Sequence, residues 1–136
     1  METIIIAVDF TSSSALTTIV DTLNEHKFDI GILVNNVGIL GPHWMPFLDL
    51  DENIVKDIIS VNVLSCTSLC HAILPGMVMK GKGAIINIGS MCSICPVPYL
   101  ATYAATKHYI AAFTKAIAAE YANRYYFVIV HLLNLR

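Results

Sequence analysis

A tyrosine and a lysine stand four residues apart in the stretch YLATYAATKHYI, which covers residues 99–110. On a helix, positions i and i+4 lie on the same face, so Tyr103 and Lys107 would present a phenol and an ammonium side by side. A free tyrosine has a pKa of about 10, and an adjacent ammonium lowers that pKa by favouring the phenolate. Such a pair can exchange a proton with a substrate near neutral pH. Taken alone, the spacing is far more typical of a surface tyrosine beside a solvated lysine.

Small and amide-bearing residues follow two apolar runs elsewhere in the chain. The segment NNVG, Asn35 to Gly38, follows one run, and Gly89 and Ser90 follow another. Residues of these types let a ligand approach the backbone, although ordinary tight turns use them too. Whether these residues bind a ligand or only form turns therefore depends on the strands and helices that position them.

Four continuous apolar runs predict strands at residues 3–8, 30–34, 84–88 and 127–133. Continuous rather than alternating runs are typical of strands buried on both faces of a parallel sheet. Helical patterns at residues 12–25, 51–74 and 101–122 lie between these runs, and Pro75 ends the second pattern. The alternation predicts one α/β domain over residues 1–136, with a mostly parallel sheet of about four strands and three main helices. Ligands in such folds gather beyond the carboxyl ends of the strands.

Composition narrows the classes of protein that remain. The chain has 136 residues, of which 56% are hydrophobic and 13% charged, and this is typical of a globular domain. The net charge of −2 provides no basic stripe, so we expect no nucleic-acid partner. Two long uncharged stretches, residues 58–79 and 83–106, are interrupted by prolines, glycines and polar residues, so we expect no membrane span.

Two of the four cysteines, Cys92 and Cys95, form a C-x-x-C pattern. A redox or metal function would need a thioredoxin-like helix start or a second pair of ligands. Pro96 and Pro98 follow at once, and the five histidines are scattered. We therefore expect reduced thiols and no metal, with a thiol-redox module as the weakest alternative.

Four motifs occur in an order that resembles the short-chain dehydrogenase/reductase family. They are LVNNVG at residues 33–38, Asn62 in SVNVLS, IINIGS at residues 85–90 and YAATK at residues 103–107, and Ser90 lies 13 residues before Tyr103. The longer matches resemble the steroid and fatty-acyl branch of that family. The resemblance implies an NADP-dependent oxidoreductase acting on the ketone, or the alcohol, of a steroid or a long-chain 3-oxoacyl substrate.

The resemblance also implies the catalytic residues. Tyr103 would be the proton donor, Lys107 would lower the pKa of Tyr103, and Ser90 would hold the carbonyl oxygen. Asn62 would interrupt its helix and hold a water in a proton relay to Lys107, although a polar residue is also tolerated in an ordinary helix.

The implied cofactor is NADP, with NAD not excluded. Tyr103 and Lys107 would contact the nicotinamide ribose, Asp9 would meet the adenine amino group, and Asn35 and Gly38 would support the adenosine side. Asp9 could instead cap the turn that follows it. The only G-x-G, residues 81–83, precedes a predicted strand and therefore fails the context of a phosphate-binding loop.

Relative to the family, the chain starts at the third strand and stops after the sixth, so the resemblance implies a partial three-layer Rossmann-like fold. A truncated, non-catalytic paralogue is therefore the main alternative function. The family further implies a small apolar substrate and pairing of subunits through the helices at residues 51–74 and 101–122. It implies a cytosol-facing location at the endoplasmic reticulum, or a cytoplasmic one without an anchor.

Overall fold

The computed structural model describes residues 3–42, 44–121 and 126–131. Three parallel strands form one sheet in the order β1-β2-β3, and helices precede or connect them. This arrangement confirms the α/β class. In chain order the elements are α1 (Ala15–Glu25), β1 (Ile32–Asn35), α2 (Glu52–Ile59), the π-helical turn η2 (Ser60–Leu64), α3 (Ser65–Lys80), β2 (Gly83–Ile88), α4 (Ala101–Tyr121) and β3 (Tyr126–His131), with short 3-10 turns at Phe47–Asp49 (η1) and Met91–Ser93 (η3).

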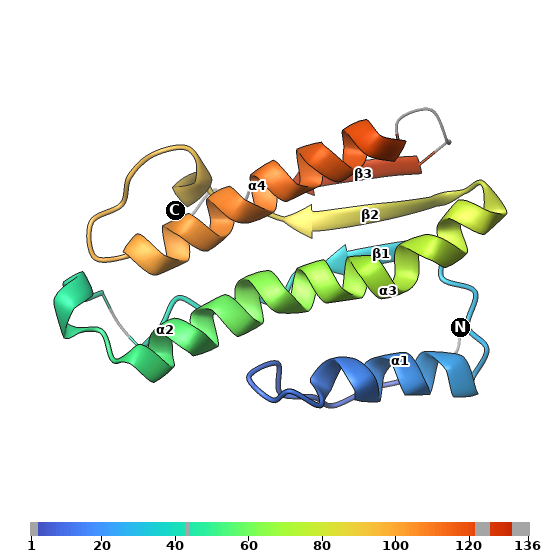
Figure 1. The fold of residues 1–136 in the computed structure, drawn as a ribbon, viewed down its shortest axis with the longest axis horizontal. Helices are drawn as coiled ribbons and strands as arrows, with labels where there is room; N and C mark the ends of the chain where they lie inside the picture. Colours follow the sequence, from blue (N-terminus) through green and yellow to red (C-terminus); the bar gives the residue numbers. More distant parts are fainter. Residues whose placement is uncertain (1–2, 43, 122–125, 132–136) are drawn as a thin grey trace.

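The long helices cover one face of this sheet. Figure 1 shows α3 and α4 running along the strands, with α1 beside α3 on the side away from α4. Leu33 and Asn35 of β1, and Ile85 and Asn87 of β2, are the less exposed residues of their strands. The main core joins α3, β2 and α4 through Cys66, Cys70, Leu74, Met77, Ile85, Ile110 and Ile117.

The opposite face of β1 is bare within the described residues. Ile32 is 64% exposed and Val34 is 54% exposed, and their register partners on β2 are Ala84 and Ile86. The described part of the chain therefore has two layers, a sheet and one layer of helices, rather than the three layers of the complete family fold.

The strand predicted at residues 3–8 was wrong, so the described sheet has three strands instead of about four. Residues 3–8 form no described helix or strand, and Ile5 is 88% exposed. An apolar run becomes a strand only when a neighbouring strand accepts and donates its backbone hydrogen bonds. The only strand that pairs with β1 in the described sheet is β2, and residues 3–8 pair with neither.

The helix predicted at residues 51–74 begins as expected but extends further. The Asp51 carboxylate accepts a hydrogen bond of 2.7 Å from the Asn53 amide and so caps α2. The helix then continues through η2 and α3 past Pro75, and it ends at Gly81, whose φ of +66° suits glycine. Proline costs a helix one hydrogen bond, which the packing of Leu74 and Met77 in the core offsets.

The combined helix Glu52–Lys80 is the one described helix that is long and apolar enough to cross a membrane. However, 44% of its most apolar window is buried inside the protein, and α3 packs on both β1 and β2. We therefore interpret it as a core helix. The other two predicted helices agree closely with α1 and α4, and residues 122, 132 and 133 of the predicted segments lie outside the described residues.

Close packing at the start of β2 gives a first prediction. A Cβ added to Gly83 would lie 2.5 Å from Cγ of the buried Met77 and 2.8 Å from its Cβ. We expect Gly83→Ala to lower the free energy of unfolding of the full-length protein by about 1–3 kcal/mol, as other overpacked cores do. Denaturant unfolding measures the effect. The matched control is Gly31→Ala, because a Cβ there meets nothing within 4 Å, and equal stability of the two variants would contradict the prediction.

Candidate active site

Tyr103 and Lys107 lie side by side on α4, as their spacing predicts. The Lys107 Nζ atom lies 5.8 Å from the centroid of the Tyr103 ring. Both side chains are buried, with 8% of Tyr103 and 5% of Lys107 exposed. Lys107 Nζ donates a hydrogen bond of 3.0 Å to the carbonyl oxygen of Ile88, the last residue of β2. The pair therefore sits where β2 ends, which is the edge at which ligands gather in α/β folds.

Burial dominates the titration of this pair. It raises the pKa of Tyr103 above its ordinary value of 10.0, while a hydrogen bond with Ser90 acts in the opposite direction. Burial also lowers the pKa of Lys107 from 10.5. The net direction is upward because burial penalises the phenolate more than the hydrogen bond with Ser90 favours it, and the lowering effect of Lys107 on the pKa of Tyr103 stays a prediction. Tyr103 is consequently protonated at neutral pH.

Ser90 lies two residues after the end of β2, with 1% of its surface exposed. Its backbone is extended, with φ of −160°, and its Oγ accepts a hydrogen bond of 3.2 Å from the Cys92 amide at the start of η3. The Ser90 side chain also acts on the Tyr103 phenol, whose pKa it lowers. The strand end and α4 thus bring together the serine and the tyrosine that the sequence separates by 13 residues.

Asn62 lies in the π-helical turn η2, so the helix is interrupted at this residue as expected. Its side chain pairs with the Ile39 backbone, accepting from the amide at 2.8 Å and donating to the carbonyl at 2.9 Å. It also donates to Thr106 Oγ1 at 3.1 Å, and Thr106 in turn donates to the Tyr103 carbonyl at 2.7 Å. Asn62 therefore links η2, the strand-end loop and α4. The water relay remains a prediction.

Gly38 lies close to the same two polar groups. A Cβ at this position would lie 3.4 Å from Asn62 Oδ1 and 3.6 Å from Lys107 Nζ. Glycine thus lets the loop after β1 approach Asn62 and Lys107 closely. For the pyrophosphate end of a dinucleotide, no glycine-rich turn leads from a strand into a helix within the part of the chain that the structure describes.

The two other predicted cofactor residues already have partners in the protein. The Asp9 carboxylate is exposed and accepts hydrogen bonds from the Thr11 amide and hydroxyl at 2.9 and 2.8 Å, which lower the pKa of Asp9. It therefore caps its turn, which was the alternative interpretation. Asn35 points into the core, where its Nδ2 donates to Asn87 Oδ1 at 2.8 Å. Any contact of Asn35 with a cofactor would therefore involve its backbone.

A narrow apolar cleft reaches Tyr103 from the side of the loop after β1. Met45 and Phe47 line this cleft, whereas the neighbouring Trp44 is 62% exposed and does not. The cleft is lined by Leu40, Met45, Phe47, Leu50, Ile58, Tyr99, Leu100, Ala101, Thr102 and Tyr103. The phenol thus stands at the end of a hydrophobic surface.

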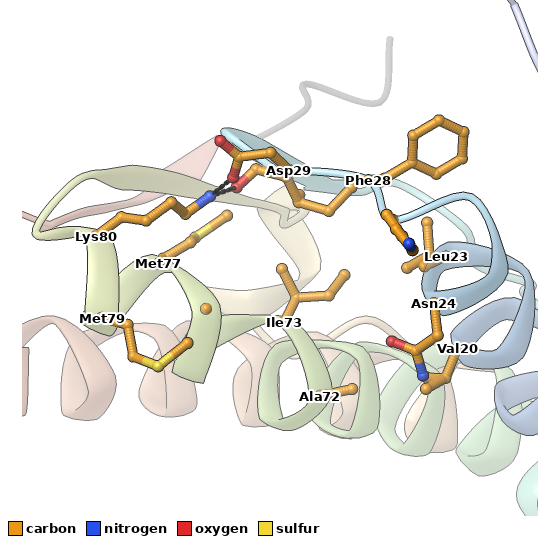
Figure 2. Close-up of a pocket in the computed structure, with 13 residues that line it drawn as sticks. Val20, Leu23, Asn24, Phe28, Asp29, Ala72, Ile73, Met77, Met79 and Lys80 are labelled. Atoms are coloured by element: carbon orange, nitrogen blue, oxygen red, sulfur yellow. Dashed lines mark hydrogen bonds and ion pairs between the residues drawn. The ribbon is translucent and has the colours of Figure 1, made fainter.

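A separate cleft of about 350 Å³ lies between α1 and α3. Figure 2 shows its apolar lining from both helices and an ion pair between Lys80 and Asp29 at one side. Lys80 is the last residue of α3 and comes shortly before the start of β2, whereas Ser90 follows the end of that strand and Lys107 contacts its last residue, Ile88. This cleft is therefore distinct from the site around Tyr103.

Within the described part of the chain, the cysteines form no metal cluster with other ligands. Cys92 is buried and Cys95 is exposed, and both are free thiols. Among the described residues, no group of three histidine, cysteine or acidic side chains could hold a metal ion.

Sequence reasoning missed two polar residues that support this site. Thr106 connects Asn62 to α4, and its position inside the YAATK motif was the available signal. Asn87 is fully buried beside the site, and its signal was an amide within the otherwise apolar run at residues 84–88.

The sequence of this chain is similar to those of known dehydrogenases and reductases. The family model for short chain dehydrogenases matches residues 1–134. The chain is 41% identical over 128 residues to the human inactive hydroxysteroid dehydrogenase-like protein 1, covering 94% of this chain and 38% of that protein. It is also 41% identical over 130 residues to the human very-long-chain 3-oxoacyl-CoA reductase, covering 94% of this chain and 41% of that protein. The chain thus spans about two fifths of the length of these relatives.

Solved structures agree with the sequence comparisons. The bulky-bulky ketone specific alcohol dehydrogenase from Comamonas testosteroni superposes with a TM-score of 0.85 at 27% identity, covering 95% of this chain and 51% of the other. A short-chain dehydrogenase from Sphingobium yanoikuyae in complex with NADPH gives a TM-score of 0.85 at 28% identity, covering 93% and 49%. The chain belongs to the short-chain dehydrogenase family.

Proposed function

We propose that the full-length protein is an NADP-dependent oxidoreductase that reduces the ketone of a steroid or a long-chain 3-oxoacyl substrate. The observation that supports it most is the convergence of Ser90, Tyr103 and Lys107 at the carboxyl end of β2. Ser90 follows β2, whereas Tyr103 and Lys107 both lie on α4, and a ketone oxygen placed between Ser90 and Tyr103 would meet two hydroxyl groups at once.

The chemistry of these side chains suits reduction. The bound nicotinamide would supply hydride to the carbonyl carbon. Negative charge would then develop on the oxygen, where the Ser90 hydroxyl stabilises it by hydrogen bonding. Tyr103 is protonated at neutral pH, as an ordinary phenol is, and burial raises its pKa further, so the proton is available for donation to that oxygen by general acid catalysis. The neighbouring Lys107 ammonium would stabilise the phenolate that remains and return a proton to it.

The residues proposed to hold the cofactor are Lys107 and Tyr103 at the ribose, with Asn35, Gly38 and Asp9 toward the adenosine. The close approach of Gly38 to Lys107 supports a cofactor that contacts both residues. The structural relatives include one with NADPH and a 4-hydroxyisoleucine dehydrogenase with NADH, so they support a nicotinamide cofactor of either kind. Our preference for NADP comes from the steroid and fatty-acyl resemblance.

The apolar cleft supports an apolar substrate. Its aliphatic and aromatic lining includes Tyr103, so a substrate that approaches the phenol would meet an apolar surface; the cleft itself has a volume of about 10 Å³, far smaller than a steroid or a long acyl chain. The two relatives at 41% identity are consistent with both halves of the proposal, since one is named for steroid dehydrogenases and the other for 3-oxoacyl-CoA reduction.

A non-catalytic paralogue is the second candidate. The observation that favours it is the equal similarity of the chain to a human relative described as inactive. The thiol-redox alternative has less support, because Cys92 is buried while Cys95 is exposed.

Assays of the purified full-length protein separate these functions. We expect NADPH to be consumed when a long-chain 3-oxoacyl-CoA or a steroid ketone is added, and to be consumed faster than NADH at equal concentration. Absence of reduction with both cofactors and both substrate classes, in protein that is folded by circular dichroism, would favour the non-catalytic paralogue.

For partners and location we propose a homo-oligomer formed through the helices at residues 51–74 and 101–122, at the cytosolic face of the endoplasmic reticulum. Exposed apolar side chains on these helices support the pairing, namely Leu64 and Tyr109, which are 55% and 40% exposed. The location rests on the family resemblance alone.

A further inference from the structure

Asn87 is the most deeply buried polar side chain of the described residues, with 0% of its surface exposed. It lies on the helix-facing side of β2, one residue before Ile88. A buried amide is costly unless its donors and acceptor are all engaged. The partners of Asn87 therefore show which elements this residue holds together.

Each polar atom of Asn87 has a partner on a different element. Its Oδ1 accepts from Asn35 Nδ2 of β1 at 2.8 Å and from the Cys66 thiol of α3 at 3.4 Å. Its Nδ2 donates to Thr114 Oγ1 of α4 at 2.9 Å. Asn35 and Asn87 are also register partners across the two strands. One side chain thus ties the end of β2 to the neighbouring strand and to both core helices.

Lys107 depends on that strand end for its position. Its Nζ donates to the carbonyl oxygen of Ile88, and the described ion pairs involve Lys56 and Lys80 rather than Lys107. Two thiols act on the pKa of Lys107, namely Cys66 of α3 and Cys92, which follows β2. Tyr103, the other titratable neighbour, lies on the same helix as Lys107. The backbone carbonyl next to Asn87 is therefore the fixed contact of an otherwise uncompensated buried ammonium.

We propose that Asn87 is a positioning residue for Lys107: by joining β2 to α4 through Thr114, it fixes the distance between the Ile88 carbonyl and the helix that carries the lysine. This proposal rests on the proposed function in one respect, which is that Lys107 assists Tyr103 in catalysis. The hydrogen bond between Asn87 and Thr114 joins the strand that carries the Ile88 carbonyl to the helix that carries Lys107. Loss of this hydrogen bond therefore moves the Lys107 ammonium relative to the phenol and admits water to the ammonium.

The test follows the titration of Lys107 in the full-length protein by NMR of its side-chain carbon adjacent to Nζ. Burial lowers the pKa of Lys107, so Asn87→Ser should move its titration midpoint upward, toward the ordinary 10.5, by about half a pH unit or more. In an active protein the same variant should lower kcat by about tenfold while KM for the substrate stays nearly unchanged, as expected for a misplaced catalytic group.

The matched control is Ile85→Val, which removes a methyl group from the same face of the same strand and touches none of these hydrogen bonds. It should reduce stability without moving the titration of Lys107. If Asn87→Ser fails to fold, Thr114→Val breaks the link from the α4 side at nearly constant shape and should shift Lys107 in the same direction.

If Lys107 titrates in a folded variant, Asn87→Ser or Thr114→Val, with the same midpoint as in the wild-type protein, the proposal is overturned. Asn87 then has a structural role only. The outcome is independent of the proposed reaction, because the NMR midpoint is measured whether or not the wild-type protein reduces a ketone. Failure of the wild-type protein to turn over would therefore count against the proposed function alone.

Discussion

The Tyr103→Phe variant of the full-length protein should lose carbonyl reduction by about a hundredfold or more, which is the usual contribution of a general acid. Phenylalanine keeps the ring that lies near Lys107 Nζ and fills the same buried space, so it removes the proton donor and little else. Steady-state kinetics measure the loss, and fluorescence titration with NADPH should show nearly unchanged binding of the cofactor.

Tyr109→Phe is the matched control for this prediction. Tyr109 lies on the same helix, its hydroxyl contacts Thr67 at 3.1 Å, and its ring is 40% exposed. Removal of that hydroxyl should leave kcat unaltered because it lies away from Ser90 and Lys107. Near-normal turnover of Tyr103→Phe, with Tyr109→Phe behaving as wild type, would refute the catalytic assignment.

The 136-residue chain produced by itself should self-associate and should not bind NADPH at micromolar concentrations. Ile32 and Val34 expose a large part of their surface on the bare face of β1, and contiguous apolar surface of this kind drives association. Within the described residues, the dinucleotide would also lack the glycine turn and helix N-terminus that usually donate backbone N–H groups to phosphate. Sedimentation velocity and calorimetry measure the two effects.

A charge on the bare face tests the cause of the association. Val34→Lys should shift the chain toward monomer, whereas Leu48→Lys, which adds the same charge to a residue 93% exposed in η1, should not. A monomeric wild-type chain that binds NADPH at micromolar concentration would show that this prediction is wrong.

The parts of the fold that could be predicted are those in which local pattern and tertiary partners agree. The spacing of Tyr103 and Lys107 places both on one face of α4, and the apolar run at residues 84–88 forms the central strand β2. The run at residues 3–8 has an equally strong pattern but no strand beside it, so the same local preference leaves it unpaired. Pairing is a property of the neighbours and is not encoded in the run itself.

The pKa shifts and hydrogen bonds of the site were harder to predict from the sequence than the identity of its residues. The sequence suggested that Lys107 controls the pKa of Tyr103, yet the net direction depends on burial, which spacing does not reveal. Likewise, Asn35 looks like a ligand-facing residue in NNVG, whereas its amide is bound to Asn87 from a strand 52 positions along the chain. Such cross-strand partners emerge only once the register is known.

The π-helical turn at Ser60–Leu64 also constrains the length of the chain. Residues before the turn, such as Ile58, face the cleft at Tyr103, while residues after it, such as Cys66, face the core above β2. Each residue of an α-helix turns the chain by about 100°, so a single deletion or insertion within the turn would rotate one half of the helix against the other. A substitution in this segment changes the contacts of one side chain. A change of one residue in its length would break the hydrogen bonds of Asn62 and would turn every side chain on one side of the segment away from its present contacts. The number of residues between α2 and α3 is therefore under stricter constraint than their identity.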